Sequence, residues 1–92
     1  MSWSVVFAKS FLKDLEKLPA SVRSQGIEFV SEQLPNTENP FQSRKLEKLQ
    51  GGTSAYKARF GDYRVGLRLN RKRRLIDVCR VLHRREIYRY FP

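Results

Sequence analysis

Cysteine and histidine are nearly absent from this chain of 92 residues, which contains one of each, Cys79 and His83. A single cysteine forms no disulfide within the chain, and the sequence holds no CxxC pair or His/Cys cluster of the kind that binds structural zinc. We therefore expect a chain without a metal ion or other cofactor, kept reduced in the cytoplasm.

Glycine-rich loops and long apolar runs are also missing. Gly51-Gly52 stands alone, so no phosphate-binding loop of the P-loop or dinucleotide type is present. The longest early apolar run, Val5–Ala8, is too short for a signal-peptide core or a membrane span. These absences argue against a secreted or membrane protein, and the length predicts one soluble domain over residues 1–92.

Acidic residues are few relative to basic ones, since 9 Asp and Glu stand against 19 Lys and Arg and the formal net charge is +10. The excess is confined to one part of the chain, because residues 1–53 have a net charge of +1 and residues 54–92 have +9. Scattered charge usually forms a solvated surface, but confined charge favours a functional basic face. We expect a polyanionic partner, nucleic acid before an anionic membrane.

Apolar spacing in the N-terminal part predicts a strand followed by two helices. Residues 2–8 are β-branched and aromatic, as strands are. From Lys9 the apolar residues recur at helical spacing as far as Pro19, which ends one helix and opens a second that runs to Pro35. Gly26, inside the second helix, weakens that helix or marks a close contact between helices. The two helices are expected to form a hairpin that covers a sheet.

The remaining residues predict an antiparallel meander, which makes the fold class α+β. Residues 35–53 are expected to be mostly a connection, with a short turn around Lys45–Leu49. The expected strands cover residues 55–60, 63–69 and 75–82, and a short closing helix covers residues 84–90.

The dipeptide Gly61-Asp62 predicts a two-residue hairpin turn that sets the register of the first two of these strands. Arg59 then pairs with Arg64, on a face that also carries Lys57 and Arg68. Like charges directly opposite one another destabilise a sheet, so stability alone does not explain this pairing. A bound anion would relieve the repulsion.

A second two-residue turn, at Arg71-Lys72, would extend the sheet. Leu67 then pairs with Ile76, and His83 falls on the basic face beside the cations of the first hairpin. Ordinary structural roles compete with functional ones here. They are a surface position for His83, a semi-buried filler for Cys79, core aromatics for Tyr88 and Tyr90, and a solvated turn for Arg71–Arg74.

A cationic face of this kind suits cleavage of RNA without a metal. RNA supplies its own nucleophile, the 2′-OH, so the protein needs only to accept a proton, stabilise the charged phosphate and protonate the leaving oxygen. Arg64 is the candidate for the phosphate, because a guanidinium offers a planar fork of donors. Lys57 or Tyr88 is the candidate base, and His83 or Arg84 is the candidate for the leaving group.

The chain shares three segments with a known family, VVFAKSFLKDLEKLP near the start, YKARFGDYRVGLRL in the hairpin and RVLHRREIYRYF at the end. In this order and spacing it resembles the RelE/ParE superfamily of toxins of bacterial toxin–antitoxin systems, more closely the RelE branch, over residues 3–90. The resemblance implies a microbial-RNase-like α+β fold and ribosome-dependent cleavage of mRNA. It also implies a RelB-like antitoxin that neutralises the toxin and, in complex with it, represses their own promoter DNA.

By position, the resemblance assigns roles to single residues. Arg64 matches the arginine that holds the scissile phosphate, and Tyr88 matches the C-terminal catalytic tyrosine. No carboxylate stands beside Lys57 in the sequence, so an acid–base pair like that of the relative YoeB is expected to be absent, which favours dependence on the ribosome. The full expected catalytic set is Lys57, Arg59, Arg64, His83, Arg84 and Tyr88. The cations expected to bind RNA and the ribosome are Arg68, Arg71, Lys72, Arg73 and Arg74.

Two alternatives to an mRNA endonuclease remain open. A ParE-like toxin shares the fold but inhibits DNA gyrase and cleaves nothing. A noncatalytic module that binds RNA or the ribosome needs only the basic charge. The expected catalytic set favours the nuclease.

Overall fold

The computed structural model describes residues 3–36, 46–49 and 54–92. Within these residues no helix is long and apolar enough to cross a membrane. The elements in chain order are β1 (Ser4–Phe7), α1 (Lys9–Glu16), α2 (Ala20–Glu28), the π-helical turn η1 (Phe29–Gln33), β2 (Leu46–Lys48), β3 (Ala55–Phe60), β4 (Tyr63–Asn70), β5 (Leu75–His83) and α3 (Ile87–Tyr90).

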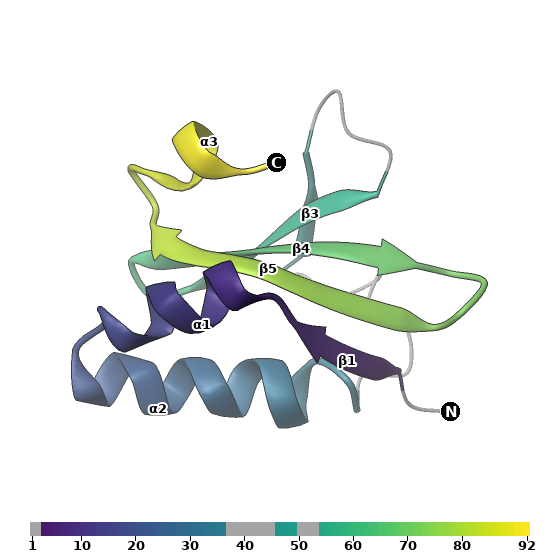
Figure 1. The fold of residues 1–92 in the computed structure, drawn as a ribbon, viewed down its shortest axis with the longest axis horizontal. Coiled ribbons are helices and arrows are strands. Elements are labelled where there is room, and N and C mark those ends of the chain that lie inside the picture. The colour runs from purple at the N-terminus through teal and green to yellow at the C-terminus, as the bar shows by residue number, and fades with distance from the viewer. Residues whose placement is uncertain (1–2, 37–45, 50–53) are drawn as a thin grey trace.

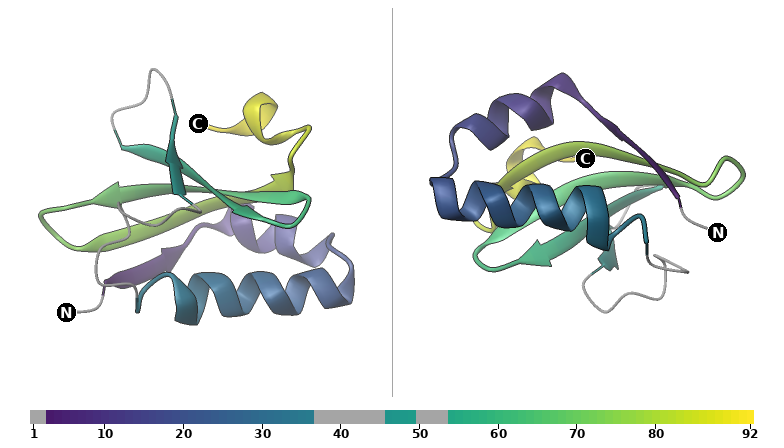
Figure 2. Two further views of the ribbon diagram at one scale, coloured as in Figure 1. Left: turned by 180° about the vertical axis from the view of Figure 1, so that it is seen from behind. Right: turned by 90° about the horizontal axis from the view of Figure 1, so that it is seen from below.

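The strands form a single sheet in the order β1-β5-β4-β3-β2. All neighbours are antiparallel except β1 and β5, which run parallel. Figures 1 and 2 show α1 and α2 on one side of the sheet and α3 on the other. The predicted α+β class is confirmed, with the N-terminal strand, the helix pair, the meander and the short closing helix in the expected order.

Proline sets the boundary between the two long helices, as the sequence predicts. α1 ends before Pro19 and α2 starts at Ala20, because the fixed φ of proline suits the start of a helix and not its interior. α2 continues into η1, where the N–H of Leu34 donates to the carbonyl of Phe29 at 2.9 Å. The buried residues between the helices and the sheet are Trp3, Phe11, Leu18, Phe29, Val30, Leu34, Ala58, Val65, Leu67, Leu69, Ile76, Val78 and Val81.

The hairpin of β3 and β4 has the predicted register. Phe60 pairs with Tyr63, and Arg59 pairs with Arg64. Gly61 in the turn has a φ of +57°, a left-handed conformation that glycine adopts without steric cost. The alternation of side chains then turns the apolar residues of both strands toward the helices and the cations toward the other face.

The second turn differs from the prediction. Four residues, 71–74, join β4 to β5, so Ile76 pairs with Leu69 and Leu67 pairs with Val78. The register shifts beside Leu67, because Gly66 pairs with Arg80 and Cys79 is an extra residue in β5. A bulge of this kind is needed to bury the apolar side chains of β5, which are spaced by two positions and then by three, at Ile76, Val78 and Val81.

Two other sequence predictions are wrong. The expected turn around Lys45–Leu49 is the strand β2 over its described residues, with Leu46 opposite Ala58. Gly26 is close to a strand and not to another helix, since a Cβ there would lie 2.9 Å from the ring of Phe60. Both results have a physical reason: three residues are too few for a periodic signal, and Gly26 makes room for an aromatic ring of β3.

α1 covers the part of β5 that β1 does not reach. Ser10 donates its hydroxyl to the carbonyl of Cys79 at 2.7 Å. Asp14, only 6% exposed, accepts hydrogen bonds from Nε and Nη2 of Arg80, at 2.7 and 3.0 Å, and from the N–H of Val81 at 3.2 Å. The hydrogen bond with Asp14 raises the pKa of Arg80. At this edge of the sheet a carboxylate of α1 thus accepts a backbone N–H that a neighbouring strand would otherwise bind.

Asp14→Ala is expected to lower the free energy of unfolding by about 3 kcal/mol, because it leaves a partly buried guanidinium and a buried N–H without their acceptor. Urea unfolding monitored by circular dichroism measures the change. Glu16→Ala, an exposed carboxylate of the same helix, is the matched control and should change stability by less than about 0.5 kcal/mol. A loss below about 1 kcal/mol for Asp14→Ala would show that the edge is held by other contacts.

Candidate functional site

The predicted cations gather on the face of the sheet that α1 and α2 leave uncovered. Lys57 and Arg59 of β3 share this face with Arg64 and Arg68 of β4, because every second residue of a strand points to the same face and the members of each pair are an even number of positions apart. We call these four residues the basic face. Arg59 and Arg64 are directly opposite, so an anion placed between them would interact with both.

Lys57 is the centre of a contact cluster on the basic face. Its ammonium donates a hydrogen bond to the hydroxyl of Tyr88 and lies 4.4 Å from the centre of the Tyr88 ring. Its Nζ is also 3.7 Å from Oε2 of Glu47, which β2 places opposite Lys57 in the sheet. The expectation that no carboxylate stands beside Lys57 is therefore wrong.

Sequence reasoning missed Glu47 because it assigned the segment to a turn. A carboxylate ten positions before Lys57 becomes its neighbour only when β2 joins the sheet beside β3. The side chain of Lys57 is 14% exposed and that of Glu47 is 67% exposed, so the carboxylate approaches the lysine from the solvent side. The ion pair with Glu47 and the hydrogen bond to Tyr88 suit a cationic role for Lys57.

The C-terminal residues hold α3 over the basic face. Ile87 is fully buried, and the ring of Phe91 packs on Gly66, where a Cβ would lie 2.7 Å from ring atoms. The guanidinium of Arg68 lies 5.3 Å from the centre of the same ring. Gly66 thus leaves the space that lets α3 reach Lys57. The buried residues on this side of the sheet are Leu49, Ala55, Ile87 and Phe91.

Tyr88 and Tyr90 of α3 are surface residues and not core aromatics. Tyr88 is 62% exposed and Tyr90 is 50% exposed. Tyr90 lies 5.4 Å beneath the guanidinium of Arg80, on the edge of the sheet near α1, whereas Tyr88 contacts Lys57. The structure therefore brings Tyr88 to the basic face and places Tyr90 elsewhere.

Arg64 is held by its own hairpin turn. Nη1 of Arg64 donates to the carbonyl of Gly61 at 3.0 Å and to the carbonyl of Tyr63 at 2.8 Å. The next carbonyl of the turn, that of Asp62, accepts the backbone N–H of Arg84 at 2.8 Å. Two residues of the predicted catalytic set are thus tied to the same turn, and the side chain of Arg84 is exposed beside it.

The predicted position of His83 beside Lys57 and Arg64 is wrong. The bulge at Cys79 reverses the alternation of β5, so His83 pairs with Tyr63, and their rings meet edge to face at 5.7 Å between centres. Nδ1 of His83 accepts the N–H of Arg85 at 3.2 Å. His83 lines a separate hollow of about 390 Å³ that it shares with Asp14, Arg80 and Tyr90.

The predicted RNA-binding cations lie at the far end of β4. Arg68, Arg71 and Lys72 line a hollow of about 450 Å³ together with Asn70 and Asp77. Arg73 and Arg74 are exposed in the same turn, and the N–H of Arg73 donates to Oδ1 of Asn70 at 3.0 Å. The structure gathers these cations at one end of the hairpin, some distance along β4 from Arg64.

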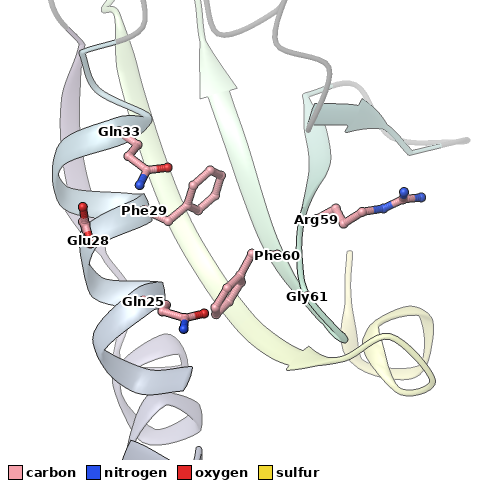
Figure 3. Close-up of a pocket in the computed structure, with 7 residues that line it drawn as sticks. All are labelled: Gln25, Glu28, Phe29, Gln33, Arg59, Phe60 and Gly61. Carbon is pink, nitrogen blue, oxygen red and sulfur yellow. The ribbon is translucent and has the colours of Figure 1, made fainter. Parts of the chain in front are cut away.

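A third hollow, of about 370 Å³, lies between β3 and the helix formed by α2 and η1. Figure 3 shows Phe60 pointing from β3 toward this helix, while the side chain of Arg59 points away from the hollow. The polar side chains on its helical wall are Gln25, Glu28 and Gln33. This hollow belongs to the helical side of the sheet and is not part of the basic face.

Cys79 contributes no nucleophile to either face. Burial raises the pKa of its thiol, and the nearby carboxylate of Asp77 raises it further, so the thiol stays protonated. This agrees with the prediction of a semi-buried filler. No group of three or more His, Cys, Asp or Glu side chains that would hold a metal ion occurs within residues 3–36, 46–49 and 54–92.

Known proteins match this chain over nearly its whole length. Residues 5–88 match the family described as ParE toxin of type II toxin-antitoxin system, parDE. Toxin RelE3 of Methanocaldococcus jannaschii is 40% identical over 90 residues, which covers 96% of this chain and 98% of that protein.

Solved structures with the same fold include two toxin–antitoxin complexes. A chain of the RelB-RelE antitoxin-toxin complex from Methanococcus jannaschii superposes with a TM-score of 0.74 and is 36% identical, covering 95% of this chain and 99% of that one. A chain of the toxin-antitoxin complex RelBE2 from Mycobacterium tuberculosis has a TM-score of 0.78 and 27% identity, covering 91% and 93%. The chain therefore belongs to the RelE/ParE superfamily of toxins of type II toxin–antitoxin systems.

Proposed function

We propose that this toxin is a ribosome-dependent mRNA endonuclease that halts translation. The observation that supports this most is the contact between Lys57 and Tyr88 on the same face as Arg64, because it combines an acid–base group with phosphate-binding cations. Inhibition of gyrase without nuclease activity does not require an acid–base group beside phosphate-binding cations.

In the proposed reaction the Tyr88 oxygen takes the proton of the 2′-OH, and the ammonium of Lys57 stabilises the negative charge that this oxygen carries as a base. The 2′ oxygen attacks phosphorus and the bond to the 5′ oxygen breaks. The products are a 2′,3′-cyclic phosphate and a 5′-hydroxyl. Arg64 and Arg59 stabilise the charge on the pentavalent phosphate, and Arg84 approaches the leaving oxygen, which takes a proton from solvent.

Two features support dependence on the ribosome. Within the described residues, α3 is the one helix on this side of the sheet, and its tyrosines are exposed, so the protein alone has little with which to bend RNA for in-line attack. The cations of the β4–β5 turn lie apart from Lys57 and Tyr88 and suit the phosphates of ribosomal RNA. We therefore assign substrate positioning to the ribosome, and ribosome contact to Arg68, Arg71, Lys72, Arg73 and Arg74.

The proposed protein partner is a RelB-like antitoxin. The structures that share this fold include complexes of RelE with RelB. The net charge of +9 over residues 54–92 would steer an acidic antitoxin to the basic face and speed association. Promoter DNA would then be a ligand of the toxin–antitoxin complex and not of the toxin alone.

A ParE-like gyrase inhibitor is the second candidate, because the matching family description is that of a ParE toxin. A noncatalytic module that binds RNA or the ribosome is the third, supported by charge alone. The three candidates differ in what stops first in a bacterium that expresses the chain, and in whether mRNA is cut.

Expression of the chain in bacteria is expected to stop protein synthesis before DNA synthesis, as pulse labelling with amino acids and thymidine would show. Primer extension on mRNA with purified protein should reveal new 5′ ends only when ribosomes are present. Arrest of DNA synthesis first would favour the gyrase inhibitor. Translation arrest without new 5′ ends would favour the binding module, and cleavage of free RNA would contradict dependence on the ribosome.

A further inference from the structure

The guanidinium of Arg64 has two of its donors occupied before any substrate binds. An arginine side chain carries five N–H donors, of which Nη1 holds two. Both have acceptors in the carbonyls of Gly61 and Tyr63, at 3.0 and 2.8 Å. Within the described part of the chain, Nε and Nη2 of Arg64 have no hydrogen-bond acceptor.

The two carbonyls also fix the direction of the remaining donors. Nε–H and one Nη2–H lie along one edge of the planar guanidinium and match two oxygens of a phosphate. Because Nη1 is held at the opposite corner by two carbonyls, this edge cannot rotate freely. Arg59, directly across the sheet, would otherwise repel Arg64, and the two carbonyl dipoles offset that repulsion.

Gly61 supplies the backbone geometry that this arrangement needs. Its φ of +57° lies in the left-handed region, which glycine occupies readily, asparagine tolerates and β-branched residues avoid. A Cβ at position 61 would meet nothing within 4 Å, so a substitution there acts through backbone conformation and not through a clash. The same turn holds the N–H of Arg84 through the carbonyl of Asp62.

We propose that the β3–β4 turn is a positioning device, in which Gly61 aims its carbonyl at Arg64 so that the Nε/Nη2 edge is oriented for a phosphate before RNA arrives. Gly61 is a positioning residue because it acts through Arg64 and touches no substrate. An arginine oriented in advance stabilises the transition state without a cost of reordering at the moment of reaction. This inference rests on the proposed nuclease function.

The test compares Gly61→Val, which disfavours the left-handed turn, with Gly61→Asn, which tolerates it. Single-turnover cleavage on programmed ribosomes should fall about 10–10²-fold for Gly61→Val and stay within about threefold of wild type for Gly61→Asn. The ribosome concentration that gives half of the maximal cleavage rate should change little in either variant. Thermal unfolding shows whether both variants are folded under the assay conditions.

A double-mutant comparison separates positioning from a general structural defect. If Gly61 acts through Arg64, adding Gly61→Val to Arg64→Ala lowers the rate no further, because the group that the turn orients is already gone. If Gly61→Val lowers the cleavage rate by the same factor in Arg64→Ala as in the wild type, the inference is overturned. A Gly61→Val rate equal to that of wild type would also overturn it.

Side-chain ¹⁵N NMR of arginine tests the orientation without cleavage. In the wild type, restricted rotation should give separate Nη1 and Nη2 resonances for Arg64, and Gly61→Val should average them. Titration with inorganic phosphate should shift Nε of Arg64 more in the wild type than in Gly61→Val. Averaged resonances in the wild type would overturn the inference. If the protein shows separate Arg64 resonances and the larger phosphate shift but cleaves no mRNA, the proposed nuclease function is wrong and the positioning of Arg64 by the turn still holds.

Discussion

Arg64→Ala should lower the rate of mRNA cleavage on programmed ribosomes by about 10²–10³-fold, the loss typical of removing one group that stabilises an oxyanion. The register places Arg64 opposite Arg59, a pairing that is unfavourable in an empty sheet and favourable around a phosphate whose negative charge grows during reaction. The side chain therefore contributes more to the transition state than to binding.

Ribosome binding of the same variant should change little, because that binding is spread over several cations of the β4–β5 turn. Co-sedimentation with ribosomes at fixed salt measures it beside the cleavage rate. Lys13→Ala, which removes an equal charge from the exposed side of α1, is the control for net charge. If Arg64→Ala loses binding and cleavage equally, Arg64 contributes only to the general positive charge of the surface and does not specifically stabilise the transition state.

Tyr88→Phe should lower the cleavage rate by about 10²–10⁴-fold, the range for loss of a general base. The change removes only the oxygen that Lys57 contacts and keeps the ring above which the ammonium lies. Tyr90→Phe is a closely matched control, since it removes the same atom from an exposed tyrosine of the same helix that contacts Arg80 instead. Tyr90→Phe should cleave at nearly the wild-type rate.

The carboxylate beside Lys57 offers the competing explanation for the base. If Tyr88→Phe keeps the wild-type rate while Glu47→Gln loses it, Glu47 takes the proton and the assignment to Tyr88 is wrong. If both variants lose similar amounts, the two groups act through the shared Lys57, and the double variant should then lose less than the product of the single losses.

Local signals were sufficient for the helices and the first hairpin. Pro19 has a steric effect that acts within one turn of helix, so the boundary between α1 and α2 can be read from the sequence. Gly61-Asp62 fixes a tight turn, and a tight turn fixes every pair of β3 and β4, including Arg59 with Arg64. The basic face was therefore predictable from β3 and β4 alone.

Long-range contacts decided what local signals did not. The bulge at Cys79 lies where β5 meets α1, and Asp14 binds the N–H of Val81 there across 67 positions of sequence. That bulge turns His83 to the helical side of the sheet. Glu47 reaches Lys57 only because a strand of three residues joins the sheet edge, and so short a strand has no periodicity to detect.

The parallel pairing of β1 with β5 sets the order in which the molecule can be completed during synthesis. Ser4 pairs with Leu75, so at about 5–20 residues per second the first strand waits about 4–14 s for its partner to be made. Such distant pairings also slow folding of the finished chain. A chain interrupted before β5 leaves β1 unpaired and Asp14 without Arg80, and it lacks α3 and Tyr88. Partial synthesis of this toxin therefore yields no basic face with Tyr88 beside Lys57.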